Sequence, residues 1–291
     1  MEVIRTADGI GVATDAVRVA GRAVGYVPTM GFLHEGHLSL MRRAREERDV
    51  VVVSIFVNPL QFGPNEDFAS YPRDLDRDLE LVEKEGVDLT FVPEVDEVFP
   101  RGRPDVTVDP GPIADRLEGA SRPGHLRGVC TVLARLFHLI GPSRVYLGEK
   151  DAQQLAVVRM MVRDLAFPIE VTGCSTAREP DGLAMSSRNT YLSEHERAAA
   201  RCLYEALRAA VDAVLAGVTD ANELLALMQE RIDREALAVL DYVAIVDEDT
   251  FENVETLTRP ARALVAARVG KPRLIDNALL PVGENGAEEG R

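Results

Sequence analysis

The continuous apolar run Asp49–Val57 (DVVVVSIFV) constrains the fold of this chain more than any other feature. A strand that is apolar on both sides must be covered on both faces, as in a parallel sheet between two layers of helices. Further strand-like runs alternate with helical patterns, and this alternation predicts an α/β fold with a doubly wound parallel sheet. These further runs are Ala23–Pro28, Val87–Val92, Arg144–Leu147 and Ile169–Cys174.

Four helical patterns separate the predicted strands. One carries apolar residues at helical spacing from Val129 to Ile140 and ends at Gly141–Pro142, a pair that cannot continue a helix. The helix predicted over Asp151–Leu165 has its apolar residues on one face, which predicts packing of that face against the sheet. The predicted helices are Gly36–Arg48, Leu75–Glu85, the one ending at Ile140, and Asp151–Leu165.

The pattern changes near Ala177, which predicts a second, smaller α+β domain. A polar, Gly-containing segment (REPDGLAMSSRN) precedes an Ala-rich helix over Ser193–Ala216, which Ser193 can cap together with Glu196. A helix over Asp220–Glu235 and three strand-like runs follow. The expected domains are 1–176 and 177–281, with a polar tail at 282–291 that we expect to be disordered. The three strand-like runs are Tyr242–Asp247, Ala263–Val269 and Arg273–Asp276.

Charge and cysteine content exclude several classes of protein. Lys and Arg number 33 against 48 Asp and Glu, a net charge of −15, so a general nucleic-acid binder is not expected. No run approaches the roughly 20 apolar residues of a membrane span, and the N-terminus does not read as a signal peptide. The cysteines Cys130, Cys174 and Cys202 are odd in number and far apart, which favours a cytoplasmic location and offers no zinc site.

The segment Pro28–His37 (PTMGFLHEGH) is the first candidate site. It lies between a predicted strand and a predicted helix, at the sheet edge where open parallel sheets bind ligands. The start of the helix favours an anion, and Gly31 and Gly36 allow close approach of the backbone. His34 and His37 can donate hydrogen bonds to phosphate oxygens. The alternative is a polar turn with two solvated histidines.

Two further segments have the residue types that a nucleotide needs. Gly148–Asp151 again joins a strand to a helix, with Lys150 for a phosphate and Asp151 for a helix cap or a ribose hydroxyl. Taken alone, this segment fits equally well a capped helix with a surface Glu–Lys pair. Met185–Asn189 offers two hydroxyls and the Arg188 guanidinium, although a Ser-Ser-Arg triplet alone fits any linker. An HxGH segment followed by a Ser-Ser-basic loop resembles the class I synthetase and nucleotidyltransferase superfamily.

Two further segments are polar where the pattern expects core residues. Asn58–Phe62 (NPLQF) follows the apolar strand, and the loop Gly63–Pro72 after it could be a lid. Arg122 and His125 precede a helix and are hypothesised to contact anions. Each segment fits a surface loop equally well when taken alone.

Together these segments resemble the pantothenate synthetase family, also called pantoate–β-alanine ligases. The resemblance is carried by PTMGFLHEGHLSL, SIFVNPLQFGPNEDFASYPRDL, RPGHLRGVCTVLARLF, YLGEKDAQQL, REPDGLAMSSRN and DYVAIVD. It implies a Rossmann-like domain, a smaller C-terminal domain that closes over the site, and a homodimer. The implied ATP-binding residues are Met30, Gly31, Phe32, Leu33, His34, Glu35, Gly36, His37, Gly148, Glu149, Lys150, Asp151, Ala177, Met185, Ser186, Ser187 and Arg188.

The resemblance also implies the chemistry. The expected reaction joins pantoate to β-alanine with ATP and Mg²⁺, through a pantoyl adenylate, giving pantothenate, AMP and diphosphate. His37 is implied as the proton donor, and His34, Lys150 and Arg188 supply positive charge. Gln61 and Gln154 are implied to hold pantoate, with Gln61 also beside β-alanine.

Three positions depart from the family pattern, and one rival function stays open. Leu126 replaces an aromatic residue, and Ala177 stands where Val is common. Arg77 replaces an acidic residue, so we assign no protein ligand to the magnesium. The rival is a nucleotidyltransferase of the same superfamily, which would join a phosphate rather than a carboxylate to the nucleotide.

Overall fold

A computed structural model describes residues 1–281 apart from 65 and 67, so the tail expected to be disordered at 282–291 lies outside the described residues. The chain folds into two compact units. The first comprises Met1–Glu149 and Gln153–Thr176, and the second comprises Lys150–Ala152 and the described residues from Ala177 onward. Each unit has its own sheet.

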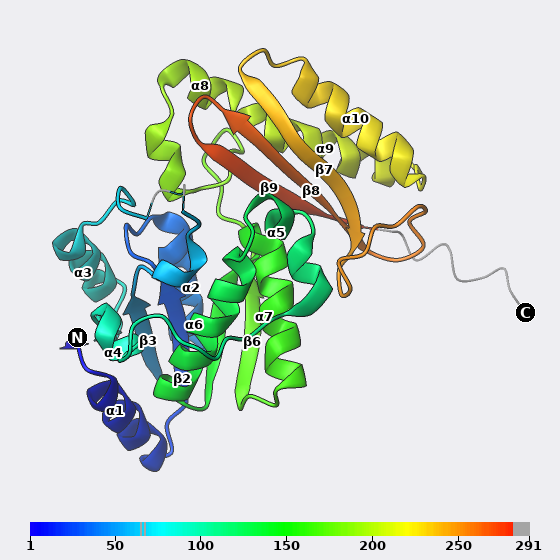
Figure 1. Cartoon of the computed structure of the whole chain (residues 1–291). Coiled ribbons are helices and arrows are strands. Elements are labelled where there is room, and N and C mark those ends of the chain that lie inside the picture. The colour runs from blue at the N-terminus through cyan, green and yellow to red at the C-terminus, as the bar shows by residue number, and fades with distance from the viewer. Residues whose placement is uncertain (65, 67, 282–291) are drawn as a thin grey trace, which may run out of the picture. The chain divides into compact units, whose positions relative to one another are not determined.

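The first unit contains a six-stranded sheet in which every strand pair is parallel (Figure 1). The strand order is β1-β4-β3-β2-β5-β6, so the doubly wound parallel sheet predicted from the sequence is confirmed. All six residues of β3 are buried, as the apolar run predicts. The strands are β1 (Glu2–Ile4), β2 (Val24–Thr29), β3 (Val50–Ile55), β4 (Leu89–Phe91), β5 (Ser143–Gly148) and β6 (Ile169–Cys174).

Helices cover both faces of this sheet. One apolar core joins α2 (Glu35–Glu47) to residues of β2 and β3, with Val82 of α3 (Leu75–Lys84) in the same cluster. Tyr26 points to the opposite face of β2 from Val27, and its ring meets Phe137 of α6 at a centroid distance of 6.4 Å. In Figure 1, α6 and α7 lie in front of the strands. The remaining helices are α1 (Ala7–Val19), α4 (Val95–Val98), α5 (Glu118–Ser121), α6 (His125–Ile140) and α7 (Ala152–Asp164).

The strand order reverses between β2 and β5. The chain runs from β2 outward to β3 in one direction, and from β5 outward to β6 in the other, while β2 and β5 are hydrogen-bonded neighbours. A crevice forms outside the carboxyl ends of two such strands, because their connections leave in opposite directions. The segments that follow β2 and β5 begin at Met30 and Glu149, so both candidate segments start at this point of the sheet.

The N-terminal strand and helix were missed by the sequence analysis, whose elements begin at Ala23. β1 contributes only three residues and pairs with β4, so it has no length over which a period could be read. Helix α1 begins after Thr6, whose side chain accepts a hydrogen bond from Gly9 N at 3.2 Å. This cap was the signal that could have revealed the helix.

The second unit is an antiparallel sheet with two helices packed on it. Its strands follow the order β7-β8-β9, and the apolar core lies between them and the helices. The small α+β arrangement predicted from the sequence is confirmed, with each strand longer than predicted. The elements are α9 (Arg201–Leu215), α10 (Ala221–Asp233), β7 (Ala238–Asp247), β8 (Ala261–Val269) and β9 (Arg273–Leu280).

The single helix predicted over Ser193–Ala216 is wrong, because the structure has two helices there. The shorter one, α8 (Glu194–Ala199), begins at the predicted Ser193–Glu196 capping box. The helix breaks at the fully buried Ala200, whose carbonyl accepts from Leu203 N at 3.3 Å, the three-residue spacing of a tighter turn. The Ala-rich composition therefore predicted helix correctly but could not reveal the change at the buried turn.

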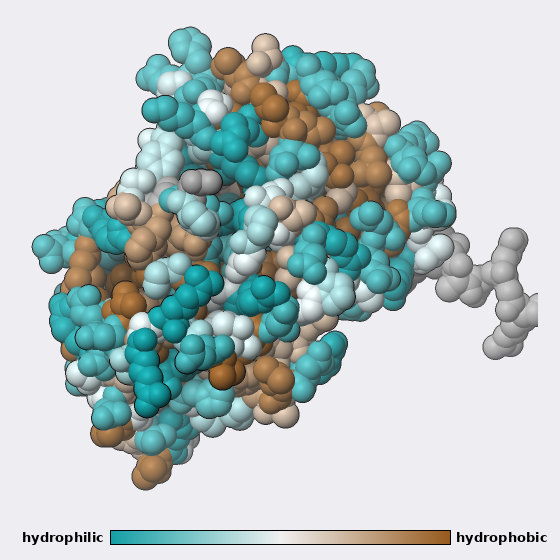
Figure 2. All heavy atoms as spheres, in the orientation of Figure 1, coloured by the Kyte–Doolittle hydropathy of each residue, from teal (hydrophilic) through white to brown (hydrophobic). Residues whose placement is uncertain are grey.

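The surface of the second unit carries apolar side chains among a mostly hydrophilic shell (Figure 2). The large exposed apolar residues of this unit include Leu215, Leu237, Val239 and Leu279. Among the described residues, no helix is both long enough and apolar enough to cross a membrane.

Candidate active site

The turn after β2 is built around a buried carboxylate. Gly31 and Phe32 adopt positive φ angles of 80° and 50°, a conformation that a non-glycine residue such as Phe32 rarely takes. Asp78 of α3 is only 1% exposed and accepts from Phe32 N at 2.6 Å and from Leu33 N at 2.8 Å. Two charge-assisted hydrogen bonds therefore hold the backbone in its left-handed turn.

Gly31 is required by this arrangement. A Cβ at this position would lie 2.9 Å from Asp78 Oδ2 and 3.0 Å from the Ile55 side chain. Burial raises the pKa of Asp78, while the hydrogen bonds from the two backbone amides oppose that rise. These amides are taken by a protein carboxylate, so Phe32 and Leu33 contribute to the turn rather than offering their N–H groups to a phosphate.

Asp78 is a site residue that the sequence analysis missed. It lies on the face of α3 that also carries the buried Val82, one turn further along. An acidic residue on the apolar face of a helix is costly to bury unless it is paired. That position was the signal that could have pointed to it.

The two histidines of the HxGH segment form a reciprocal cap on α2. His34 Nδ1 accepts from Gly36 N at 3.2 Å, and His37 Nδ1 accepts from His34 N at 3.3 Å. The two rings lie 4.1 Å apart between centroids. Ser or Thr with Glu or Gln usually fill this capping box, so two imidazoles in these places are unusual.

This cap fixes the tautomer of both rings. A neutral imidazole that accepts at Nδ1 carries its proton at Nε2, so both rings are Nε2–H tautomers in their neutral form. The amides of His34 and Gly36 are occupied by the rings, so imidazole rather than those amides supplies hydrogen-bond donors at the start of the helix. The interpretation of His37 as a helix cap is therefore compatible with hydrogen-bond donation from Nε2. Proton transfer needs the imidazolium, whose protonated Nδ1 cannot accept from His34 N.

Gln61 is held beside this turn. It ends the short 3-10 helix Pro59–Gln61 and is 8% exposed. Its Nε2 lies 2.9 Å from Met30 Sδ, and its Oε1 accepts from Asn58 Nδ2 at 3.1 Å. Gly128 of α6 permits this packing, because a Cβ there would lie 2.2 Å from Leu60 O. The structure thus brings together Met30 and Gln61, which the resemblance assigned to two different substrates.

Arg122 and His125 are engaged with protein groups in this structure. Arg122 donates to both carboxylate oxygens of Glu66, at 2.8 and 2.6 Å. Its Nη1 lies 2.9 Å from His125 Nε2, while His125 Nδ1 lies 2.9 Å from Gln61 O. A carbonyl can only accept, so His125 donates from Nδ1 and accepts from Arg122 at Nε2.

Burial sets the charge of the His125 ring. Burial, followed by the Arg122 guanidinium, lowers the pKa of His125 to about 4, so the ring is neutral near pH 7. His125 therefore brings no positive charge to an anion at that pH. Its contact with Gln61 O instead fixes the backbone of the predicted pantoate residue. Glu66, which sequence reasoning missed, comes from the loop that we considered as a lid.

Gln153 and Gln154, which follow β5, differ in burial and in their contacts. Gln153 is 3% exposed and donates to Ile113 O and Arg116 O at 2.6 and 2.9 Å, so it anchors the preceding loop. Gln154 is partly exposed on the first turn of α7. Lys150, grouped with the second unit, has its ammonium 3.5 Å from Asp151 Oδ1. Of the two glutamines, Gln154 has the more exposed side chain.

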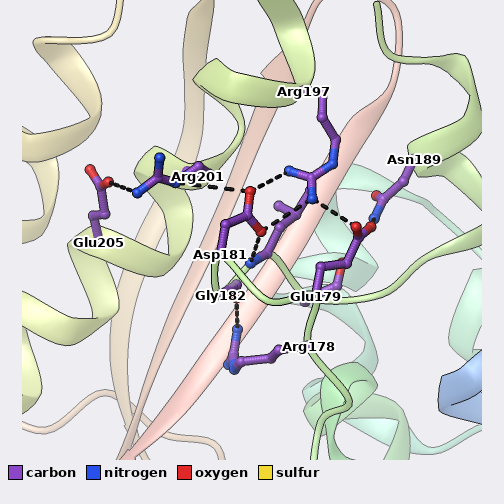
Figure 3. Close-up of polar contacts among 10 residues, drawn as sticks. Arg178, Glu179, Asp181, Gly182, Asn189, Arg197, Arg201 and Glu205 are labelled. Atoms are coloured by element: carbon purple, nitrogen blue, oxygen red, sulfur yellow. Dashed lines mark hydrogen bonds and ion pairs between the residues drawn. The ribbon is translucent and has the colours of Figure 1, made fainter. Parts of the chain in front are cut away.

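The predicted Ser-Ser-Arg loop lies in the second unit (Figure 3 shows its surroundings). Ser186 caps the short 3-10 helix Ser187–Tyr191, its Oγ accepting from Arg188 N at 3.2 Å. Met185 N donates to Ala177 O at 2.9 Å, so the two predicted residues at the start of this segment are directly joined. All four residues from Met185 to Arg188 are at least partly buried.

Comparison with known proteins decides the family. A sequence profile of the pantoate-beta-alanine ligase family matches residues 2–279. The chain is 51% identical over 282 residues to pantothenate synthetase from Thermotoga petrophila, spanning 96% of this chain and 100% of the relative. The chain belongs to the pantoate–β-alanine ligase family. The resemblance found in the sequence motifs is thereby confirmed.

Solved structures of this family share the fold. Pantothenate synthetase from Thermus thermophilus is 48% identical, with a TM-score of 0.90 over 97% of this chain and 100% of that chain. A pantoate-beta-alanine ligase from Francisella tularensis, complexed with beta-gamma ATP and beta-alanine, is 34% identical. Its TM-score is 0.79, over 97% of this chain and 99% of that chain.

Proposed function

We propose that this chain is an AMP-forming ligase that condenses pantoate with β-alanine through a pantoyl adenylate. The observation that carries the proposal is the paired imidazole cap of His34 and His37 at the reversal point of the sheet, in a chain of this family. The ligand complex of the Francisella tularensis relative supports ATP and β-alanine as substrates.

The proposed chemistry needs positioning and charge stabilisation rather than a protein nucleophile. A carboxylate already is a nucleophile, so the enzyme holds pantoate in line with the α-phosphate of ATP. His37 Nε2–H donates a hydrogen bond to a phosphoryl oxygen, while His34, Lys150 and Arg188 balance the charge of the diphosphate. As the imidazolium, with Nδ1 released from His34 N, the same ring can pass a proton to the leaving group and return to the neutral form. The amine of β-alanine then attacks the acyl carbon, and AMP leaves.

The two glutamines are proposed to hold pantoate. An amide both donates and accepts, which matches the hydroxyl groups of pantoate. The Gln61 side chain is buried and tied to Asn58, so it is oriented before a ligand arrives. Gln61 is also proposed to lie beside β-alanine, and Ala177 to lie near the adenine.

Magnesium is proposed to arrive bound to ATP. Within the described residues, no group of three or more His, Cys, Asp or Glu side chains is arranged to hold a metal ion. Mg²⁺ commonly keeps several waters and binds through substrate phosphates, and it would neutralise phosphate charge there. The protein groups that fit such a complex are the cationic side chains of Lys150 and Arg188, which accompany the metal rather than ligate it.

Diphosphate exchange tests the first step. With pantoate and Mg·ATP, but without β-alanine, labelled diphosphate should exchange into ATP. AMP release should then depend on β-alanine. An exchange that requires β-alanine would rule out the two-step scheme. A stable dinucleotide product in place of amine-dependent AMP would support the rival nucleotidyltransferase.

Variants of the glutamines test the pantoate assignment. Gln61→Ala and Gln154→Ala should weaken pantoate use by on the order of 0.5–1.5 kcal/mol each, the value of a hydrogen bond to a neutral group. ATP affinity should stay nearly intact. Gln153→Ala is the matched control. Because Gln153 anchors a loop, this substitution should lower the stability of the protein rather than its affinity for pantoate. Equal loss of ATP and pantoate binding would contradict the assignment.

Three broader features belong to the same proposal. Residues 1–176 are proposed as the nucleotide and pantoate domain and 177–281 as a lid domain that closes over it. The enzyme is proposed to be a homodimer, which light scattering would test. A cytoplasmic location is supported by Cys130, Cys174 and Cys202, all free thiols.

A further inference from the structure

One arginine in the second unit bridges two carboxylates (Figure 3). Arg197 of α8 donates to Glu179 Oε2 at 2.7 Å and to Asp181 at 2.8 and 3.1 Å. Arg201 stands 4.0 Å from the same Asp181 carboxylate and also pairs with Glu205 at 3.3 Å. The fork of a guanidinium suits such a double contact, which an ammonium could not reproduce.

The two carboxylates belong to a tight hairpin that leads into the Ser-Ser-Arg loop. Glu179 N donates to Leu183 O at 2.9 Å, and Gly182 N donates to Glu179 O at 2.8 Å. Gly182 has a φ of 95°, and a Cβ there would lie 2.2 Å from the Tyr204 ring. The positive φ of Gly182 and the close approach of Tyr204 therefore both restrict the conformation of the hairpin.

The hairpin is fixed on its other side as well. Arg178 pairs with Asp276 of β9 at 2.6 and 3.0 Å, and its guanidinium lies 5.0 Å from the Tyr204 ring centroid. Asp276 is 4% exposed, so this ion pair is largely shielded from solvent. The hairpin thus has a firm attachment to the sheet before the chain enters the loop.

The Ser-Ser-Arg loop spans the gap between the hairpin and α8. Asn189 Nδ2 donates to Ala184 O at 3.1 Å, which ties the far end of the loop back to the hairpin. After the loop the chain enters α8, and Arg197 returns to Glu179 and Asp181 across 18 and 16 residues of sequence. The Arg197 guanidinium therefore joins the helix that follows the loop to the hairpin that precedes it, in addition to the contact made by Asn189.

We propose that the Arg197 clamp, defined as Arg197 with Glu179 and Asp181, positions the Ser186–Arg188 loop for the phosphates of ATP. This inference rests on the proposed function, because it assigns a support to the same nucleotide site. Arg197 is a positioning residue: its guanidinium is occupied by the two carboxylates, and it acts through the backbone of the loop. An ordered loop binds the nucleotide without the entropy cost of arranging its donors.

The clamp predicts a specific kinetic signature. Arg197→Gln should raise the KM for ATP in diphosphate exchange on the order of tenfold, the effect of about 1.4 kcal/mol of lost preorganisation. The KM for pantoate should change less than twofold, because pantoate is held by other residues. Arg197→Lys keeps the charge but not the fork, so it should restore only part of the ATP affinity.

Matched variants separate positioning from stability. Arg208→Gln on α9 removes an arginine that pairs with Asp212 at 3.1 Å, and it should leave both KM values unchanged. Asp181→Asn should raise the KM for ATP in the same direction as Arg197→Gln. The double variant should be less affected than the product of the two single effects, because both remove one interaction.

The outcomes decide the proposal clearly. If folded Arg197→Gln, verified by circular dichroism, melts earlier but keeps the wild-type KM for ATP, the clamp is only structural and the inference is wrong. If Arg197→Gln does not fold, Asp181→Asn and Glu179→Gln carry the same test. Absence of diphosphate exchange in the wild-type enzyme would instead overturn the proposed function. Exchange in the wild type with no change in any clamp variant would overturn this inference alone.

Discussion

The HxGH turn and the Ser-Ser-Arg loop are assigned to the same nucleotide but are held by different forces. In the turn, the buried carboxylate of Asp78 binds two backbone amides, and the two histidines cap their own helix. In the loop, Arg197 joins carboxylates whose side chains are 31% and 33% exposed. One region is fixed by buried contacts, and the other by ion pairs that water reaches.

This difference suggests a division of work between the two regions. Buried hydrogen bonds to a carboxylate are strong and little affected by salt, so the turn keeps the imidazoles in one orientation. Exposed ion pairs are screened by salt, so the order that the clamp gives the loop should depend on ionic strength more than that of the turn. The first arrangement fits the proposed hydrogen-bond donation from a ring of fixed orientation, and the second fits the proposed ordering of a phosphate-binding loop without burial of its charges.

The largest expected effect is on catalysis through His37. His37→Ala should lower the adenylation rate roughly 10²–10⁴-fold, because it removes the donor proposed to act mainly in the transition state. The variant should bind ATP within a few-fold of wild type. It should also lose about 0.5–2 kcal/mol of stability, because the ring is part of the helix cap. Single-turnover kinetics and thermal unfolding measure both effects.

Conservative variants of His37 separate its two roles. His37→Gln and His37→Asn keep a hydrogen-bond donor but cannot transfer a proton. Substantial recovery of the rate would favour electrostatic donation over proton transfer. A variant that loses stability while its folded fraction keeps full turnover would refute the catalytic assignment.

The next effect concerns the buried support of the turn. Asp78→Ala should reduce the free energy of unfolding by about 2–6 kcal/mol, because each of two buried donors left without a partner costs about 1–3 kcal/mol. Asp76→Ala, an exposed position on the same helix, should change it by less than about 0.5 kcal/mol. Urea unfolding measures both, and equal effects would remove the contrast between the two regions.

A fall in pH should reduce the free energy of unfolding of the first unit through protonation of His125. Its pKa is lowered from 6.5 to about 4, so below pH 6.5 the unfolded chain binds a proton that the folded chain does not. Its contribution to stability is therefore complete above pH 6.5 and falls by about 3 kcal/mol as the pH drops to about 4. In the second unit, the hydrogen bond from Arg197 lowers the pKa of Asp181, so Asp181 keeps its charge over most of this window.

A histidine replacement checks this window. His125→Gln should flatten the loss of stability between pH 6.5 and about 4, as measured by urea unfolding at several pH values. His195→Gln, exposed on α8, should keep the wild-type slope. If both variants lose stability with the wild-type slope, His125 is not the group responsible.

The smallest expected effect is the response to salt. At about 1 M NaCl the screening length falls to about 3 Å, which weakens exposed ion pairs far more than buried hydrogen bonds. Amide hydrogen exchange should therefore rise a few-fold in residues 185–189 and change little in residues 31–37. The expected difference is below about 1 kcal/mol. Equal responses of the two segments would show that the clamp is not what orders the loop.

Much of the first unit could be predicted because its signals are local. The run at Asp49–Val57 marked a buried strand, and the Gly141–Pro142 pair marked the end of a helix that the structure confirms at Ile140. The supports of the site could not be predicted in this way. Asp78 lies 46 residues from Phe32, and Glu66 lies 56 residues from Arg122, so no local period links them.

By itself, the sequence determined the family and the order of most strands and helices from Ala23 onward, and it predicted the segments that carry the chemistry. Periodicity, turn residues and short motifs act within a few residues, and they are readable before folding. Only the tertiary structure decided what those residues do to one another. It turned His34 and His37 into a reciprocal cap, made His125 neutral, and assigned Gln153 to anchoring a loop. These outcomes depend on burial and on partners from distant elements, because desolvation and hydrogen bonding are set where segments meet in space.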